Sequence, residues 1–349
     1  MLRMKVNKQR LCECMKKMIR YVSVMLAAVL LLPVFSVSAA DKRRIVRIGG
    51  VPFGLTMYTD GVIVVNVRED EDSPAYAAGI RENDRIIRAD GEEVTSNEQL
   101  RDMITSSEGE DIELSILRGK SPISVTITPE QDEDGSYTAG MWVRDSTAGL
   151  GTVTYFDEST HSFGALGHGI CDRDTGMLMP LLTGQVVKAQ ISSITKAKKG
   201  VAGGLNGIMT DDEIGELTVN SGYGVYGRYT VTPEGEEFPC AYDSEIRTGK
   251  ATIYTTLDDK GIGQYEVMIE SLNLSDNSGQ NLVLRVTDEA LLEKTGGIIQ
   301  GMSGSPIVQD GRLVGAVTHV FVNSPEKGYG ITIGNMLACY EQYGGMKSS

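Results

Sequence analysis

The sequence predicts a mainly β chain of two domains, a small α+β domain followed by a larger all-β domain. Glycine is abundant at 41 residues, only 6% of the residues are aromatic, and Val, Ile and Thr recur in short alternating stretches. This composition favours strands joined by many turns. A length of 349 residues is enough for two domains that each bury their own core.

The N-terminus has the pattern of an export signal. Seven Lys or Arg residues and one acid, Glu13, precede an apolar stretch from Val22 to Val37, and small residues follow up to Ala40. We expect residues 1–40 to be a signal peptide, cleaved after Ala39, or a membrane anchor. Loss of residues 1–39 removes seven positive charges and one negative charge, so the net charge of −14 becomes −20. An acidic surface of this size disfavours nucleic acid as a partner.

No metal or cofactor is expected. The chain has three histidines and no H-E-x-x-H motif, so zinc chemistry is not indicated. Cys171, Cys240 and Cys339 follow the export segment at spacings that match no metal site. We expect them to be small buried thiols, with at most one incidental bridge and no disulfide framework.

Residues 45–130 resemble a PDZ domain of the bacterial type. The matching segments, in order, are the apolar-Gly-apolar turn Phe53-Gly54-Leu55, the strand Gly61–Val67, the short helix Ser73–Ile80, the strand and turn Asn83–Val94, the helix after Ser96, and the hairpin Glu113–Ile127. In that family a peptide C-terminus adds as a strand to a sheet edge. The resemblance implies that the N–H groups of Phe53, Gly54 and Leu55 bind the terminal carboxylate. Residues 131–137 are acidic and lack a core pattern, so we expect a linker there.

The segment Gly301–Pro306 has the form of a serine-hydrolase nucleophile loop. Small residues around Ser303 let the backbone turn tightly and let N–H groups converge on a developing oxyanion. The apolar stretches 306–308 and 313–317 follow and predict a hairpin. A nucleophile turn that leads into a buried hairpin resembles the chymotrypsin-like double-barrel peptidases. Ser305 is a rival nucleophile, but only Ser303 has glycine at both i−2 and i+1.

The base that activates a serine is usually a histidine, and this chain offers three. His161 lies in a polar turn and is expected to be solvated. His319 ends a predicted strand and is expected to pack against or line the site. His168 lies in the apolar, glycine-bracketed segment 164–170, and it is the candidate base.

The third member of a serine-peptidase triad is a carboxylate that orients the imidazole. Asp288 follows the apolar strand 282–287 and precedes Ser303 by fifteen residues, so it can reach the same cleft. On the local pattern alone, an N-cap of a helix over residues 289–294 is favoured. Both roles can coexist.

Four long motifs resemble the stage IV sporulation protein B (SpoIVB) peptidases of endospore-forming bacteria. They are Arg144–Thr152, Gly164–His168, Thr295–Pro306 and Gly315–Asn323. With the order of export segment, PDZ domain and peptidase domain (residues 138–349), the resemblance spans almost the whole chain. It implies a chymotrypsin-like double β-barrel, a triad of His168, Asp288 and Ser303, and an oxyanion hole built from the N–H groups of Gly301 and Ser303.

The same resemblance implies an exported, membrane-proximal serine endopeptidase of the forespore intermembrane space. Its substrate would be a membrane-bound regulator of an intramembrane metalloprotease, whose release leads to sigma-factor processing. Self-cleavage and binding of peptide C-termini by the PDZ domain are also implied. Two alternatives remain open, an envelope quality-control protease and a non-catalytic scaffold that acts through its PDZ domain.

Overall fold

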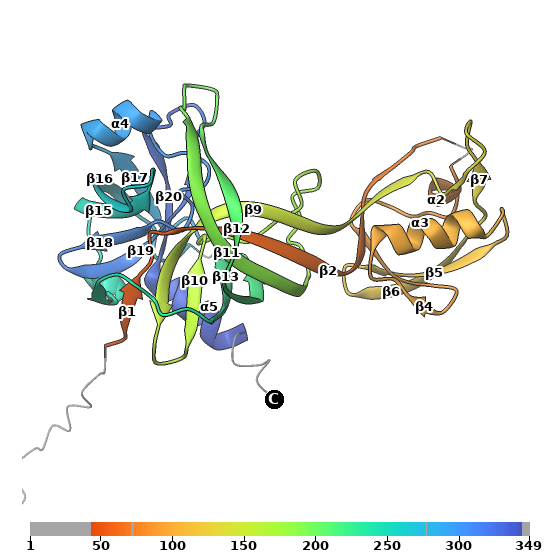
Figure 1. Ribbon diagram of the computed structural model, residues 1–349, viewed down its shortest axis with the longest axis horizontal. Coiled ribbons are helices and arrows are strands. Elements are labelled where there is room, and N and C mark those ends of the chain that lie inside the picture. The colour runs from red at the N-terminus through yellow and green to blue at the C-terminus, as the bar shows by residue number, and fades with distance from the viewer. Residues whose placement is uncertain (1–42, 71–72, 277, 344–349) are drawn as a thin grey trace, which may run out of the picture. The chain divides into compact units, whose positions relative to one another are not determined.

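The computed structural model describes residues 43–70, 73–276 and 278–343, and strands predominate in them (Figure 1). The signal peptide or membrane anchor predicted for residues 1–40 lies outside the described residues. Within the described ranges, no helix has the length and apolar character needed to cross a membrane. The fold is mainly β, as the sequence predicts.

The first barrel is a ring of antiparallel strands. In spatial order they are β2 (Pro52–Val67), β9 (Met141–Asp157), β10 (Ser162–Ala165), β13 (Gly224–Tyr229), β12 (Gly204–Ser221) and β11 (Leu181–Thr195). The ring closes because β2 pairs with both β9 and β11. Strands β1 (Ile45–Ile48) and β14 (Glu237–Pro239) extend the sheet beyond β9. Side chains that alternate inward along β2, such as Phe53 and Met57, fill the barrel together with Phe163.

The structure corrects the expected position of the peptide-binding loop. Phe53, Gly54 and Leu55 lie inside strand β2, where Gly54 is opposite Leu150 on one side and Val187 on the other. Their backbone groups belong to a ladder with strands on both sides, so they cannot receive a terminal carboxylate. The apolar-Gly-apolar pattern has a packing cause instead. A Cβ atom on Gly54 would lie 2.4 Å from Cγ of Met209.

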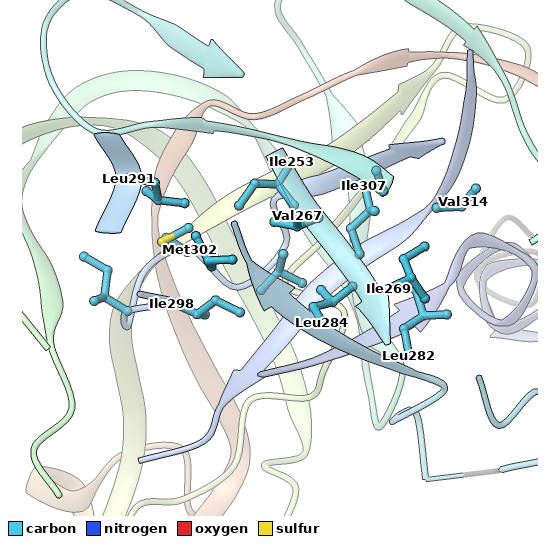
Figure 2. Close-up of a cluster of buried hydrophobic side chains, with 14 of the residues drawn as sticks. Ile253, Val267, Ile269, Leu282, Leu284, Leu291, Ile298, Met302, Ile307 and Val314 are labelled. Atoms are coloured by element: carbon cyan, nitrogen blue, oxygen red, sulfur yellow. The ribbon is translucent and has the colours of Figure 1, made fainter. Parts of the chain in front are cut away.

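The second barrel is also closed and antiparallel. In spatial order its strands are β15 (Gly249–Thr256), β16 (Ile262–Leu272), β17 (Leu282–Val286), β20 (Lys327–Thr332), β19 (Arg312–Val320) and β18 (Pro306–Gln309). Figure 2 shows its core, in which Ile253, Val267 and Leu284 come together. Met302 of the predicted nucleophile loop is fully buried in the same core. The predicted double barrel is therefore confirmed, and its second half anchors the nucleophile loop.

The predicted PDZ segment forms an α+β module. It contains the second half of β2, β3 (Asp84–Ala89), β4 (Glu92–Glu93), β5 (Ile112–Arg118), β6 (Ser121–Ile127), the first residues of β9, and helices α2 (Pro74–Ala77) and α3 (Asn97–Ser106). The module has a core of its own, which includes Val64, Ile86 and Leu100. Ser96 caps α3, because its Oγ accepts the N–H of Gln99 at 3.1 Å.

The acidic segment 131–137, expected to be a linker, folds as a tight hairpin. Strand β7 (Glu130–Gln131) pairs with β8 (Tyr137–Thr138). The carboxylate Oδ1 of Asp132 accepts the N–H groups of Asp134 and Ser136 at 3.0 and 2.8 Å. Asp132, one of the acidic residues of this segment, therefore stabilises the turn.

Three short elements complete the second barrel region, the 3-10 helix η1 (Asp243–Glu245) and helices α4 (Glu289–Thr295) and α5 (Ile333–Tyr343). Helix α4 connects β17 to the nucleophile loop and ends at Gly296, which has a φ of 76°. Helix α5 packs on β19 and β20. None of the three described cysteines forms a disulfide; Cys240 and Cys339 are buried as expected, whereas Cys171, expected to be buried, is exposed.

Candidate active site

A cavity of 460 Å³ is lined by residues of both barrels. The first barrel contributes Leu55 of β2, residues 147–150 of β9 and, after β10, Leu166 and residues 168–171. The second contributes residues 298–303, except the buried Met302, and the end of β19 at residues 318–320. His168, Ser303 and His319 all line this cavity. Among its described lining residues, none is Asp, Glu, Lys or Arg.

Two glycines make the sharp turn at Ser303 possible. Gly301 and Gly304 have φ angles of 94° and 95°, which side chains disfavour. A Cβ atom on Gly304 would lie 1.9 Å from the carbonyl oxygen of Thr152. Glycine at both positions of this G-x-S-G segment is therefore required by backbone conformation, and at Gly304 also by the close approach of β9.

Thr152 of β9 holds the nucleophile loop and the turn before His168 together. Its N–H donates to the carbonyl of Ser303 at 2.9 Å, and its Oγ1 donates to the carbonyl of Gly301 at 2.8 Å. Its own carbonyl accepts the N–H of Leu166 at 3.3 Å. Thr152 is only 1% exposed, so these bonds form away from water. One residue thus fixes both sides of the cavity.

The N–H groups of Gly301 and Ser303 are available as donors. Neither N–H donates to another group in the part of the chain that the structure describes. Two unbonded N–H groups that flank a nucleophile are the donors that an oxyanion hole requires. The prediction that Gly301 and Ser303 form the oxyanion hole is compatible with these unbonded N–H groups.

The Ser303 hydroxyl is bound to the main chain. Its Oγ donates to the carbonyl oxygen of Thr318 at 2.6 Å, and the described contacts include no hydrogen bond between Ser303 and His168. Ser305 is fully buried, and its Oγ has no hydrogen-bond partner among the described residues. Of the two serines in this loop, only Ser303 lines the cavity.

His168 follows a turn in which Leu166 and Gly167 have φ angles of 65° and 71°. Its Nδ1 lies 2.9 Å from the carbonyl oxygen of Gly169. A carbonyl can only accept, so this bond places the proton on Nδ1 and leaves Nε2 as the basic nitrogen. Burial lowers the pKa of His168, although the Gly169 carbonyl opposes the shift. The neutral form, which can take a proton, is favoured.

Asp288 lies at the start of helix α4 and is not among the residues that line the cavity. Its Oδ1 accepts the N–H of Leu291 at 2.9 Å, and its Oδ2 accepts the N–H of Glu266 at 3.3 Å. These bonds match the N-cap role that the local pattern allowed. The structure brings His168 and Ser303 to one cavity, whereas the place of Asp288 in a triad stays a prediction.

The other two histidines differ in their surroundings. His161 is exposed, as expected, and its ring contacts that of Tyr229 with centroids 4.3 Å apart. His319 lines the cavity, and its ring centroid is 4.7 Å from that of His168. The sequence indicated a lining role for His319 but gave no signal that the two imidazoles touch.

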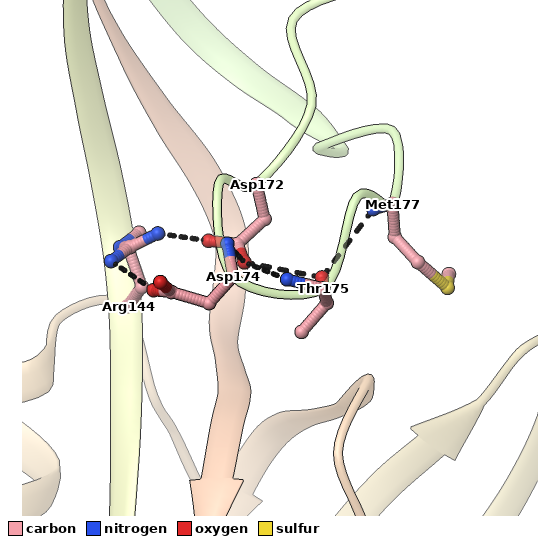
Figure 3. A network of polar contacts seen from close by, with 5 residues as sticks. All are labelled: Arg144, Asp172, Asp174, Thr175 and Met177. Atoms are coloured by element: carbon pink, nitrogen blue, oxygen red, sulfur yellow. Dashed lines mark hydrogen bonds and ion pairs between the residues drawn. The ribbon is translucent and has the colours of Figure 1, made fainter. Parts of the chain in front are cut away.

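The turn that follows His168 is held by a polar network (Figure 3). The buried Asp172 accepts the N–H groups of Asp174 and Thr175 at 3.0 and 2.9 Å. Its carboxylate also pairs with Arg144 of β9, which donates to Asp174 at 2.8 Å as well. Burial by itself would raise the pKa of Asp172, but the N–H groups of Thr175 and Asp174 and the charge of Arg144 outweigh it and lower that pKa.

The PDZ module offers a strand edge at a place that the sequence did not indicate. Residues 141–145 of β9 pair with β2 on one side, and no described strand pairs with their other side. Helix α3 lies beside β8 and β9, and the N–H of Asn97 at its start donates to Asp145 at 2.8 Å. Trp142, the only tryptophan, is 56% exposed on this edge. PDZ domains receive a peptide as an added strand at a sheet edge, so this is the position that the fold offers.

Comparison with known proteins identifies both parts of the chain. The family model for SpoIVB peptidase S55 matches residues 135–337, and the model for a PDZ domain matches residues 49–128. The serine protease HTRA1 of Xenopus tropicalis is 39% identical over 75 residues, which are 22% of this chain and 16% of HTRA1. The chain spans less than a quarter of the length of the curated relatives it matches.

Solved structures show two partial likenesses. The PDZ domain of an SdrC-like protein from Listeria monocytogenes is 26% identical, with a TM-score of 0.22, and the match covers 24% of this chain and 87% of that chain. The active form of the Rv3671c protease from M. tuberculosis is 14% identical, with a TM-score of 0.34, and the match covers 57% of this chain and 75% of that chain.

Replacing Thr152 tests its bridging role. Thr152→Val keeps the shape of the side chain but leaves the Gly301 carbonyl without its donor, so we expect the free energy of unfolding to fall by about 1–3 kcal/mol. Labelling of Ser303 by a fluorophosphonate should also slow by roughly tenfold or more, because a small displacement of reacting groups is costly. Thr152→Ser keeps the hydroxyl and serves as the control. Equal labelling rates for wild type and Thr152→Val would contradict the role.

The Asp172 network predicts a pH-dependent contribution to stability. Since the pKa of Asp172 is lowered on folding, its contribution is present above the ordinary carboxyl pKa of about 4 and is lost as the pH falls through the folded value. We expect Asp172→Asn to lower the free energy of unfolding by about 1–3 kcal/mol at pH 7. The difference from wild type should shrink toward pH 3.

The matched control is Asp174→Asn. Asp174 is the exposed partner of Arg144 in the same network, so its loss should cost less than about 1 kcal/mol. Urea unfolding followed by circular dichroism measures all three proteins. A constant Asp172→Asn difference between pH 7 and pH 3 would exclude the assigned role.

Proposed function

Because this chain belongs to the SpoIVB peptidase S55 family and carries a PDZ domain, we propose that it is an exported serine endopeptidase with Ser303 as nucleophile and His168 as base. One observation carries the proposal. Ser303, His168 and the unbonded N–H groups of the nucleophile loop meet at a cavity lined by both barrels. An acyl-transfer site needs these three components together.

In the proposed reaction, the Ser303 Oγ attacks the scissile carbonyl carbon while its proton passes to Nε2 of His168. The carbonyl oxygen becomes an oxyanion, which the N–H groups of Gly301 and Ser303 stabilise. The imidazolium then gives its proton to the leaving amine as the C–N bond breaks. A water molecule, activated by the same nitrogen, hydrolyses the acyl-enzyme.

In the observed arrangement, the Ser303 hydroxyl does not donate to His168. The Ser303 hydroxyl donates to the Thr318 carbonyl, so its side chain must turn about χ1 to donate to His168. Catalytic hydrogen bonds are often absent or long without substrate. A substrate strand that donates its own N–H to the Thr318 carbonyl would compete for that acceptor and favour the turn.

Asp288 is the proposed third member, by family resemblance. Its observed bonds support a cap on helix α4, and both of its carboxylate oxygens accept a backbone N–H. The Nδ1–H of His168 is bound by a main-chain carbonyl, which supports the correct tautomer without a carboxylate. A catalytic role for Asp288 therefore requires its carboxylate to leave the cap.

We assign peptide C-termini as ligands of the PDZ module, bound as an added strand at residues 141–145 of β9. The free edge and the neighbouring helix α3 support this position. The same strand continues into residues 147–150, which line the cavity. A ligand on this edge would lie along the strand that borders the reactive groups.

The proposed biological role is that of a sporulation signalling protease in the forespore intermembrane space. The substrate would be a membrane-bound regulator whose cleavage activates an intramembrane metalloprotease and hence sigma-factor processing, and self-cleavage would accompany it. The family membership supports this role. Selective cleavage of one such regulator, with casein left intact, would separate it from a quality-control protease.

The enzymatic proposal predicts a reactive Ser303. We expect a fluorophosphonate to label Ser303 in the full-length chain, and Ser303→Ala to abolish both this labelling and any self-cleavage, as read by mass spectrometry. Absence of labelling in folded wild-type protein would contradict the proposal and favour a scaffold.

The same assay decides the role of Asp288. Asparagine is as good an N-cap as aspartate, so Asp288→Asn keeps the helix cap and removes the negative charge. A triad carboxylate would make this substitution cost about 10⁴-fold in rate. A residue that only caps α4 would leave the rate nearly unchanged, and Asp288→Ala would then lower stability alone.

The position of Trp142 predicts a signal for peptide binding. Decapeptides that end in an apolar residue should change the fluorescence of Trp142, because the added strand covers its exposed side chain. Amidation of the peptide C-terminus should weaken binding, since the carboxylate is then lost. Equal affinity for both forms, or binding without any change in emission, would place the ligand elsewhere.

A further inference from the structure

The two cavity histidines contact each other through their rings. His319 comes from the end of β19 and His168 from the segment after β10, so one imidazole belongs to each barrel. Their centroids are 4.7 Å apart and the ring planes are inclined by 37°. The distance lies within the range over which aromatic rings interact, and the tilt is intermediate between stacked and edge-to-face arrangements. Thr318, the residue before His319, accepts the Ser303 hydroxyl.

The remaining support of the His168 ring is slight. A single hydrogen bond to the adjacent Gly169 carbonyl fixes Nδ1, and no charged side chain lines the cavity among the described residues. The Asp288 carboxylate is held at the start of α4. The described ring contact of His168 is the one with His319.

We propose that His319 is a positioning residue, whose imidazole stacks on His168 and holds that ring in place for proton transfer with Ser303. This inference rests on the proposed peptidase function. In a serine-peptidase triad, the carboxylate orients the imidazole. Here the contact with the His319 ring would supply part of that orientation.

The charges at the site agree with this assignment. The titratable groups that line the cavity are His168 and Cys171 on the segment after β10 and His319 on β19, and residues 147–150 and 298–303 contribute none. Partial burial, followed by the charge of His168, lowers the pKa of His319 to about 4. His319 is thus neutral at pH 7, and the face of a neutral ring can stabilise the imidazolium that forms on His168.

The test compares His319→Phe, which keeps a flat ring, with His319→Ala, which removes it. We expect His319→Ala to slow fluorophosphonate labelling of Ser303 by roughly 10- to 100-fold, less than the loss of a whole general base. His319→Phe should stay within about threefold of wild type, because the ring contact persists. His161→Ala, which alters an exposed histidine away from the cavity, is the control.

A second measurement does not depend on activity. With three histidines in the chain, the imidazole NMR signals of full-length Ser303→Ala protein can be assigned by single substitutions. His319→Ala should move the His168 titration midpoint upward, toward the ordinary value of about 6.5, since water then reaches the ring. His319→Phe should leave the midpoint close to its starting value.

The outcomes separate the two proposals. Unlabelled wild-type protein with the expected NMR shifts would reject the peptidase function and leave the ring contact in place. An unchanged labelling rate and midpoint in His319→Ala would overturn the positioning role. Loss of labelling in His319→Phe as complete as in His168→Ala would also overturn it, because His319 would then act as a proton acceptor.

Discussion

The hydrogen bonds of Thr152 are the constraint on which the candidate site depends. Through its N–H and hydroxyl, this residue holds the carbonyls of Ser303 and Gly301, and through its carbonyl it holds Leu166. The nucleophile loop belongs to the second barrel and His168 to the first, so neither barrel contains the site alone. The N–H groups of Gly301 and Ser303 lie in the preceding peptide planes and donate to no other group among the described residues. The nucleophile loop and the turn before His168 are thus held against each other by one buried threonine.

Strand β9 extends this constraint toward the PDZ module (Figure 1). Its first residues form the free edge beside α3, the next ones line the cavity, and Thr152 follows. Arg144, which belongs to this free edge, pairs with Asp172 on the turn after His168. The proposed peptide-binding edge and the turn that follows His168 are therefore linked by one strand and one ion pair, in which Asp172 is buried and Arg144 is half-buried. This connection consists of strand β9 and the Arg144–Asp172 ion pair.

The sequence predicted best what local chemistry determines. The glycines around Ser303 are required by φ angles that few other residues adopt, and the apolar strands after Ser303 are required by burial. The Phe53-Gly54-Leu55 pattern misled, because a glycine that makes room for Met209, 155 residues later, looks the same as a glycine in a loop. Likewise, the contact of His319 with His168 joins segments of two different barrels, which no local pattern indicates. The cap formed by Asp288 could be predicted from adjacent residues, because an N-cap bonds within its own helix. A triad role would depend on the position of His168 as well, which the sequence around Asp288 does not show.

The bond between Thr152 and Gly301 spans 149 residues of chain. Contacts of such separation can form only after the intervening segments have been synthesised and folded. The first barrel, with His168, can therefore not meet the nucleophile loop until residues beyond Gly301 have been synthesised. A nascent chain that ends before this loop carries no assembled candidate site. The activity proposed for this protein would thus be withheld until late in its synthesis.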